Sequence, residues 1–366
     1  GRQAVSRSVC VIVPSVGNQV ELGITLDGLL AQSYYGPCEI VVVGPGADPG
    51  REQAESRTVR FIDDAGSRTR ADACNVALDA TESELVFFTD DDVIVARTWV
   101  EQLARWFERP EVAGVGGPNF APPEHSTLQQ QIIDVSFCSR IFTVGTNYGR
   151  KGAGELDEVE QLPGVNSAYR RSVLQEVGGF PPGCIGAEDV ILDHMIRQAG
   201  HRLWTDKTAV MWHRRRDLSR VKRQIRNYGL VRTLASHEHR ELRAWSHTIV
   251  AMFPPIVLSA FAFFFWGLAN GGLNWPEFWD ISYETVPMGW PRAGVHTLVS
   301  LIVLYNLIAW YGAAKGNSPC RTPKTVFLSS IATFALHWNY GMGVLQGWWR
   351  IFTGNSGLQI DDRSRD

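Results

Sequence analysis

The stretch ELVFFTDDDVIVA (residues 84–96) ends an apolar run with Asp90, Asp91 and Asp92 and then resumes with β-branched residues. Carboxylates placed side by side repel one another, and none of them is buried cheaply without a partner. Two interpretations follow. The aspartates form a solvated turn after a strand, or they bind a divalent cation together with an anionic ligand. The segments on either side have to distinguish the two.

Short apolar segments alternate with helical patterns before this stretch. SVCVIVP (8–14), EIVVVGPG (39–46), VRFID (59–63) and ELVFFTDDD (84–92) are typical of strands. ELGITLDGLLAQSY (21–34) has leucines at helical spacing, and RTRADACNVALDA (68–80) has alanines on one side. The alternation predicts an α/β domain with a mostly parallel sheet. Ligands of such sheets bind outside the carboxyl ends of the strands, where the three aspartates lie.

Composition and charge argue against several classes of protein. The chain has 366 residues and a formal net charge of -3, which gives no reason to expect a nucleic-acid partner. Its six cysteines show no CxxC spacing, which indicates buried thiols in a reducing compartment instead of disulfides or a zinc site. We see no apolar segment typical of a signal peptide near the start.

Residues beyond 248 have the composition of membrane segments. IVAMFPPIVLSAFAFFFWGLA (249–269) and VHTLVSLIVLYNLIAWYGAA (295–314) are each long enough to cross a bilayer core of about 30 Å. TVFLSSIATFALHWNYGMGVLQG (325–347) is a third, more polar segment, and a buried core helix is the alternative for each. We expect an α-helical transmembrane domain with about three helices in residues 246–350. The polar tail, 351–366, would then lie opposite the N-terminal domain.

Charges beside these segments predict their orientation. Basic residues flank the first segment on its N-terminal side and fill the loop after the second: Arg240, Arg243, Lys315, Arg321 and Lys324. The loop between the first two segments is mainly acidic: Glu277, Asp280 and Glu284. By the positive-inside rule, the domain formed by residues 1–215 is cytoplasmic, and the chain is a multi-pass protein of the cytoplasmic (inner) membrane.

A basic stretch, HRRRDLSRVKRQIRNYGLVRTL (213–234), connects the two parts. Val221, Ile225 and Tyr228 share one helical face, with arginines and a lysine among or opposite them. Across residues 216–245 we expect an interfacial helix that docks the domain on an anionic leaflet, where each cation contributes about 1 kcal/mol. The alternative is a solvated helix of the soluble domain.

Several motifs follow one another in a fixed order along residues 8–215: VCVIVPSVGN, RADACN, FFTDDDV, LPGVNSAYRR, GAEDVILDHMIRQAG and VMWH. Together they resemble the family 2 glycosyltransferases, inverting enzymes with the Rossmann-like GT-A fold. The membrane segments resemble the subgroup that builds exopolysaccharides or lipid-linked glycans. The resemblance implies a nucleotide-sugar donor and a polyprenyl-linked or other glycan acceptor.

The resemblance also implies roles for acidic residues. The DxD motif of the family falls on Asp90 and Asp92, which implies Mg²⁺ or Mn²⁺ beside the diphosphate of the donor. His213 matches a histidine near the metal or diphosphate, although a lone histidine that closes a strand is more often structural. Asp189 matches the general base; the alternative is that Glu188 and Asp189 only cap a helix.

Other positions match the loops that bind the donor or acceptor. Gly164 and Asn166 lie in the matched pocket loop, and Pro14 closes the first strand. Arg70 stands where relatives carry a basic residue, and Asn75 ends the same motif. Glu188 is a further candidate for donor or acceptor binding. On the same helix, Asp193 is expected to be an exposed carboxylate.

Two departures from the family pattern weaken the nucleotide site. Val16 replaces an aromatic residue, and Gly44 and Pro45 stand where relatives carry an aspartate that holds the base or ribose; Asp48 is the nearest substitute. A hydrogen bond to a charged group contributes roughly 1.5–3 kcal/mol. Two hypotheses therefore stay open: an active membrane glycosyltransferase, or a catalytically weak or inactive GT-A-like domain that is a scaffolding subunit for other membrane proteins.

Overall fold

The computed structural model describes residues 7–17, 20–141, 156–184, 186–270 and 290–358. Eight strands of the N-terminal part form one sheet in the order β3-β2-β1-β4-β9-β6-β10-β8. They are β1 (Val9–Pro14), β2 (Cys38–Gly44), β3 (Arg60–Asp63), β4 (Leu85–Phe88), β6 (Val112–Gly116), β8 (Leu156–Val159), β9 (Ser167–Arg170) and β10 (Arg202–Asp206). The four strands predicted from the sequence are β1 to β4.

The direction of the strands corrects one expectation. β1 pairs in parallel with β2 and β4, and β2 pairs in parallel with β3, as predicted. β9 runs antiparallel between β4 and β6, and β8 runs antiparallel at the edge, so the whole sheet is mixed. Ser167 begins β9 opposite Phe88 and Gly116, near the carboxyl ends of its neighbours. The loop before β9 is therefore at the edge of the sheet where ligands bind.

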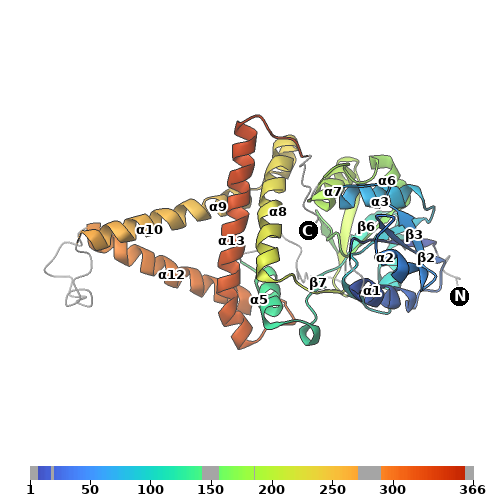
Figure 1. The fold of residues 1–366 in the computed structure, drawn as a ribbon, viewed down its shortest axis with the longest axis horizontal. Coiled ribbons are helices and arrows are strands. Elements are labelled where there is room, and N and C mark those ends of the chain that lie inside the picture. Colours follow the sequence, from blue (N-terminus) through green and yellow to red (C-terminus); the bar gives the residue numbers. More distant parts are fainter. Residues whose placement is uncertain (1–6, 18–19, 142–155, 185, 271–289, 359–366) are drawn as a thin grey trace.

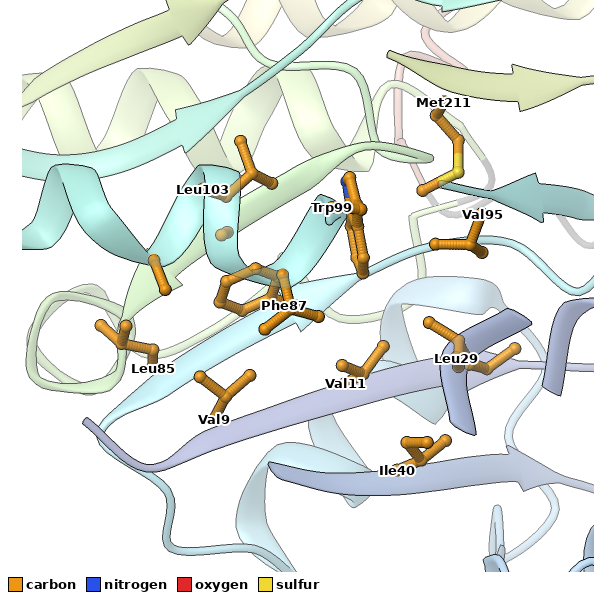
Figure 2. Packing of buried hydrophobic residues seen from close by; sticks show 14 of the residues in the cluster. Val9, Val11, Leu29, Ile40, Leu85, Phe87, Val95, Trp99, Leu103 and Met211 are labelled. Carbon is orange, nitrogen blue, oxygen red and sulfur yellow. The ribbon is translucent and has the colours of Figure 1, made fainter. Parts of the chain in front are cut away.

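Helices cover both faces of this sheet, because its central strands are apolar on both sides. On one face, Val9 and Val11 pack with leucines of α1 (Val20–Leu30) and with Trp99 of α4 (Trp99–Ala104). Figure 2 shows this core, in which the rings of Phe87 and Trp99 meet edge to face with centroids 5.3 Å apart. On the other face, Cys10 and its neighbours pack against α3 (Arg70–Asp79), α6 (Arg171–Val177) and α7 (Glu188–Gln198).

A second, smaller sheet was not foreseen from the sequence. Its order is β5-β11-β7, formed by β5 (Val93–Val95), β11 (Met211–His213) and β7 (Asn119–Phe120). β11 is antiparallel to β5, with His213 opposite Val93. Since β5 follows the three aspartates directly, this pairing carries His213 to them.

Long helices form the rest of the molecule (Figure 1). They are α8 (Leu218–Glu238), α9 (Trp245–Ala251), α10 (Phe253–Ala269), α12 (Trp290–Ala314) and α13 (Pro323–Phe352), with α5 (Leu128–Phe137) packed beside them. α10 and α12 pair as a hairpin that projects away from the sheet, and α13 stands between this hairpin and α8 (Figure 1). The acidic residues Glu277, Asp280 and Glu284 lie outside the described residues.

Two helices in the described part of the chain are long and apolar enough to cross a membrane, whereas about three were expected. They are Trp245–Ala269 and Arg292–Ala314, with mean hydropathies of 2.1 and 1.6. The expected third segment, 325–347, is part of α13 and is less hydrophobic than these two helices. Its small residues pack against α8: a Cβ on Gly343 would overlap the backbone oxygen of Arg226, and one on Gly229 would overlap that of Tyr340.

The packing of α8 also differs from the expectation of an interfacial helix. Val221 and Ile225, the face expected to meet lipid, are buried with Ile133 of α5 and Leu336 of α13. The cationic side chains at 220, 222, 223 and 226 are exposed on the remaining faces. The apolar face of α8 therefore binds protein, because α13 covers it.

A buried ion pair lies where the α/β domain meets the helices. Arg215, just after β11, donates through Nε to Asp134 Oδ1 of α5 at 2.8 Å and through Nη1 to Asn119 Oδ1 of β7 at 2.7 Å. Ser318, in the α12–α13 loop, donates to Asp134 Oδ2 at 2.6 Å. Asp134 and Arg215 are 0% and 5% exposed. The loop between two C-terminal helices is thus bonded to the small sheet that carries His213.

Candidate active site

The three aspartates after β4 point to three different partners. Asp90 accepts a hydrogen bond from Arg70 Nη2 at 3.1 Å, and Asp91 accepts one from the Ser15 hydroxyl at 2.6 Å. Asp92 Oδ1 lies 3.0 Å from His213 Nε2. The repulsion expected within the stretch is therefore relieved by separate partners, and Asp91 is turned away from the other two, toward β1.

Asp90, Asp92 and His213 form a cluster that fits a divalent cation. One ligand atom from each lies within 4.8 Å of the others. Ligands about 2.1 Å from one Mg²⁺ lie at most about 4.2 Å apart, so the cluster needs a shift of only a few tenths of an ångström. Two carboxylate oxygens and one imidazole nitrogen suit Mn²⁺ as well as Mg²⁺. The three sequence-predicted ligands are thus together at one point.

The environment of Asp92 keeps it ionised. Burial raises the pKa of Asp92, but the hydrogen bond and charge of His213 and the charge of Arg216 outweigh burial and hold that pKa below its ordinary value. An ionised carboxylate is what a hard cation requires.

Arg70 connects this cluster to the helix that carries the candidate base. It is the first residue of α3, which begins at the N-cap Thr69. In addition to Asp90, it donates through Nη2 to the Gly164 carbonyl at 2.9 Å and approaches Glu188 through Nη1 at 3.4 Å. The Arg70 side chain is 24% exposed. One side chain therefore joins the end of β4, the loop before β9 and the start of α7.

Asp189 and Glu188 begin α7, as the sequence predicted. Asp189 Oδ2 accepts a hydrogen bond from the Gly164 N–H at 3.2 Å, and Oδ1 accepts one from Val190 N–H at 2.9 Å. The N-cap itself is Ala187, whose φ is 56° and whose side chain is only a methyl group. Because Asp189 also bonds to Gly164 in another loop, it does more than cap its own helix.

The two carboxyl groups at the start of α7 hold protons more tightly than free side chains do. Burial, and then the charge of Asp189, raises the pKa of Glu188 to about 7, while Arg70 opposes the shift. Burial also raises the pKa of Asp189, against the opposing effects of Arg70 and the two backbone hydrogen bonds. A carboxyl that titrates near neutral pH is suited to proton transfer.

Two asparagines expected to contact ligand instead hold the scaffold. Asn166 is 0% exposed; Oδ1 accepts from the Trp99 indole at 2.8 Å, and Nδ2 donates to the carbonyls of Pro118 and Ala209. Asn75 exchanges two hydrogen bonds with the backbone of Phe180. Both amides are thus engaged by protein groups, a role that the sequence motifs did not distinguish from ligand binding.

The expectation that Asp193 is an exposed carboxylate is wrong. Asp193 is 0% exposed and accepts hydrogen bonds from the Leu162 N–H at 2.5 Å and the Tyr169 hydroxyl at 2.8 Å. Burial raises the pKa of Asp193 well above its ordinary value. It anchors the loop that holds Gly164 to the middle of α7, a link between distant segments that helical spacing alone does not reveal.

The loops after β1 and β2 form the opposite side of the site. Pro14 ends β1 beside Val43, at the same edge of the sheet as the aspartates. A Cβ on Gly44 would overlap the carbonyl of Ser15, so this position accommodates no side chain without a backbone shift. Asp48 is 9% exposed, and its oxygens accept from the N–H groups of Gly17 and Gly50 at 2.6 and 2.7 Å. Asp48 therefore ties these loops together.

Comparisons with known proteins agree with this geometry. A family model described as "Glycosyltransferase like family 2" matches residues 6–229. An O-antigen chain rhamnosyltransferase of Salmonella typhimurium is 24% identical, covering 51% of this chain and 60% of the relative. A glucosyl-dolichyl phosphate glucuronosyltransferase of Haloferax volcanii is 26% identical, covering 47% of this chain and 55% of the relative. The chain thus spans at most three fifths of these curated relatives.

A solved structure extends the likeness to the C-terminal helices. A mannosyltransferase from Pyrobaculum calidifontis, in complex with GDP-Man and Mn²⁺, matches with a TM-score of 0.52 at 19% identity. The match covers 94% of this chain and 88% of that one. At this identity the likeness shows the fold, a GT-A α/β domain followed by helices.

Proposed function

The chain belongs to the glycosyltransferase-like family 2, and from this premise we propose that it moves a sugar, with inversion, from a nucleotide-sugar donor to a lipid-linked or membrane-proximal glycan. The strongest support is the continuous set of contacts from Asp90 through Arg70 to Gly164, Glu188 and Asp189. It joins a cation-binding cluster to a carboxylate with a raised pKa. An inverting transfer needs both parts side by side.

Asp189 is the general base in this proposal. It takes the proton of the acceptor hydroxyl as that oxygen attacks the anomeric carbon from the face opposite the diphosphate. Its hydrogen bond from Gly164 fixes the carboxylate, and Arg70 balances its charge. Loss of a general base lowers a rate by roughly 10² to 10⁴.

Asp90, Asp92 and His213 are the proposed ligands for Mg²⁺ or Mn²⁺. When bound, the cation would neutralise the diphosphate and stabilise the charge that develops on the departing nucleotide. The Mn²⁺ present in the mannosyltransferase complex supports this choice. Arg70 and Pro14, which border the same edge of the sheet, are proposed to line the donor site.

We place the α/β domain, residues 1–215, in the cytoplasm at the inner membrane, with 216–245 as the connector. The α10–α12 hairpin crosses the bilayer, and Arg240, Arg243, Lys315 and Arg321 stay on the cytoplasmic side. The names of the Salmonella and Haloferax relatives support an acceptor of the lipid-linked class. α13 packs on α8, so the chain beyond it stays on the side of the catalytic domain.

Cysteine labelling in sealed membranes tests this topology. Cys38 is exposed on the α/β domain, and the other five cysteines are buried. With two spans, Asn355→Cys reacts on the same side as Cys38, whereas Ser282→Cys reacts on the opposite side. Three spans would move Asn355→Cys to the side of Ser282→Cys, which would contradict this arrangement.

Turnover with a panel of nucleotide sugars tests the function. Wild type is expected to transfer sugar to a membrane-extracted acceptor, and Asp189→Asn is expected to bind the same nucleotide sugar but lose turnover. Asp79→Asn, an exposed carboxylate at the end of α3, serves as the matched control and is expected to retain the rate. An Asp189→Asn variant with the wild-type rate would remove the base assignment.

A scaffolding role is the second candidate. Two observations favour it. Gly44, where the family carries a carboxylate that binds the base or ribose, has no room for a side chain. Asp48, the nearest substitute, is engaged in loop contacts. A nucleotide-binding measurement separates the two candidates, because a scaffold needs no nucleotide affinity. Failure of wild type to bind any nucleotide diphosphate with Mn²⁺ would favour the scaffold.

A further inference from the structure

A cavity of about 320 Å³ lies on the side of α7 that faces α8. Figure 1 shows these two helices next to each other, and the apolar contact of Ile191 with Val231 and Ala235 holds them together. The volume of the cavity is at the lower end of the range for small-ligand sites. The wall is mostly polar and includes Val190, His194, Arg197, Arg232, Glu241 and Arg243.

Arg232 is the unusual member of this wall. The Nε atom of Arg232 is buried and has no hydrogen-bond partner within the described part of the chain. Burial lowers the pKa of Arg232, and interactions with Tyr340, Asp189 and Glu160 oppose that effect. A guanidinium stays charged in proteins at neutral pH, and a buried donor without an acceptor is unfavourable. A ligand with negative charge would remove that penalty.

The other charges of the cavity are partly compensated. Arg197 faces Glu160 at 3.8 Å. His194 lies 3.8 Å from Glu241, but burial lowers the pKa of His194, so Glu241 keeps its negative charge. The Nε atom of Arg243 donates to the Ser236 carbonyl at 3.0 Å, but that contact leaves its positive charge in place. Arg232 and Arg243 together outweigh Glu241, so the cavity has an excess of positive charge that favours an anion.

The chemistry of two arginines points to a phosphate group. A guanidinium presents paired donors that match the oxygens of a phosphate, which also carries enough charge to balance a buried cation. A neutral sugar would satisfy neither requirement.

The position of the cavity indicates which molecule carries the phosphate. Val190, in its wall, directly follows the proposed base Asp189. Residues 241–244, on the other side of the cavity, lead into Trp245–Ala269, the first apolar span. A ligand held here has its phosphate between the catalytic helix and the start of a membrane segment.

We propose that this cavity binds the phosphate of a glycan acceptor linked to a polyprenyl phosphate or diphosphate, with Arg232 as its main ligand and Arg243 at its rim. The inference rests on the proposed function, which leaves the chemistry of the acceptor open. The lipid chain would extend along the α10–α12 hairpin, while a hydroxyl of the glycan beyond the phosphate reaches Asp189 and gives it the proton.

Binding of soluble probes to the detergent-solubilised full chain tests the site. Farnesyl phosphate is expected to bind, and farnesol, which lacks the phosphate, is not. Arg232→Gln is expected to weaken farnesyl phosphate about 10- to 100-fold, the loss that follows from removing a charged hydrogen bond. Arg232→Lys restores part of the affinity. Arg223→Gln, an exposed cation on the same helix, is the control for general attraction and is expected to bind like wild type.

Equal affinity in wild type and Arg232→Gln would overturn the proposal. So would farnesol that binds as tightly as farnesyl phosphate, or short-chain phosphatidylglycerol that shows the same affinity and the same dependence on Arg232. The last would identify a lipid headgroup site. Inorganic phosphate binding more tightly than farnesyl phosphate would likewise exclude an acceptor site. If Arg232→Gln does not fold, Arg243→Gln replaces it, with a smaller loss expected.

Kinetics separate this proposal from the transferase proposal. In an active enzyme, Arg232→Gln raises the KM for the acceptor and leaves the KM for the donor unchanged. An unchanged acceptor KM would contradict the phosphate site but not the transferase proposal. If wild type never turns over but binds farnesyl phosphate in a way that depends on Arg232, the transferase proposal is contradicted and the phosphate site is not.

Discussion

His213 Nε2 lies 3.0 Å from Asp92 Oδ1, a contact that exists because β11 pairs antiparallel with β5. The small sheet thereby adds an imidazole to a carboxylate motif that comes from a different part of the chain. With Asp90, it completes three ligands of a kind that suits Mn²⁺.

The first prediction concerns metal affinity. Asp92→Asn and His213→Gln are each expected to weaken Mn²⁺ binding about 10- to 100-fold. The first variant removes a charged carboxylate ligand, and the second removes the imidazole ligand. Isothermal titration calorimetry in the presence of a nucleoside diphosphate measures this. Asp91→Asn, whose carboxylate accepts a hydrogen bond from Ser15, is the matched control and is expected to keep wild-type affinity. Unchanged affinity in Asp92→Asn would contradict the site.

The second prediction concerns pH. Burial and the charge of Asp189 raise the pKa of Glu188 from an ordinary 4.5 to about 7, and burial raises the pKa of Asp189. Since the base must be ionised, kcat/KM is expected to rise with pH as Asp189 loses its proton, at a pH above the ordinary range of an aspartate. Glu188→Gln removes the adjacent charge and is expected to move this acidic limb to lower pH. A limb that stays in place in Glu188→Gln would show that the two carboxyls do not interact.

The same shift has a consequence for stability. Because the folded-state pKa of Glu188 is raised, its favourable contribution is present below about pH 4.5 and is lost as the pH rises to about 7. Between these values, the wild type is expected to lose stability relative to Glu188→Gln. Denaturant titrations at both pH limits measure the difference, with Asp79→Asn as a control that shows no such trend.

The third prediction concerns the buried ion pair. Asp134→Ala leaves Arg215, the Ser318 hydroxyl and the Ala121 N–H without their shared acceptor. Breaking a buried pair from one side typically destabilises a protein by about 3–5 kcal/mol. Chemical unfolding of the solubilised chain is expected to show a loss of this size. A loss under about 0.5 kcal/mol, typical of surface substitutions, would mean that the pair is not desolvated in solution.

The fourth prediction concerns the contact of α8 with α13. Gly343→Ala places a methyl group against the Arg226 carbonyl and is expected to destabilise the protein by about 1–3 kcal/mol, as overpacking generally does. Gly357→Ala is the control, since a Cβ there meets no atom within 4 Å. Thermal unfolding in detergent compares the two. Equal midpoints would show that the helices separate readily.

Local patterns predicted the parts of the fold that depend on neighbours in sequence. The apolar runs of β1 to β4, the helix that begins at Glu188 and the carboxylates after β4 all follow from spacing and residue type. The antiparallel β9, the small sheet and the burial of Asp193 depend on contacts between distant segments, which no local pattern encodes. Asn166 shows the limit most clearly: its motif predicts contact with ligand, but its amide bonds to Trp99 and two carbonyls.

The C-terminal helices show a different limit. Hydropathy identified α10 and α12, because both lie in long apolar segments, with mean hydropathies of 2.1 and 1.6. The segment 325–347 is less hydrophobic because one of its sides meets α8. A criterion based on length and composition uses only the average hydropathy of a helix. It cannot distinguish a helix that lies against protein from one that crosses a lipid bilayer.

The core shared by α5, α8 and α13 determines how this protein can be dissected. Ile133, Val221 and Ile225 are covered by Ala332 and Leu336, which come from far along the chain. A fragment cut after residue 242 would retain the whole α/β domain yet expose this apolar face to water, and we expect such a fragment to aggregate. The α/β domain and α13 are therefore one inseparable folding unit, although the long apolar helices α10 and α12 interrupt it in sequence.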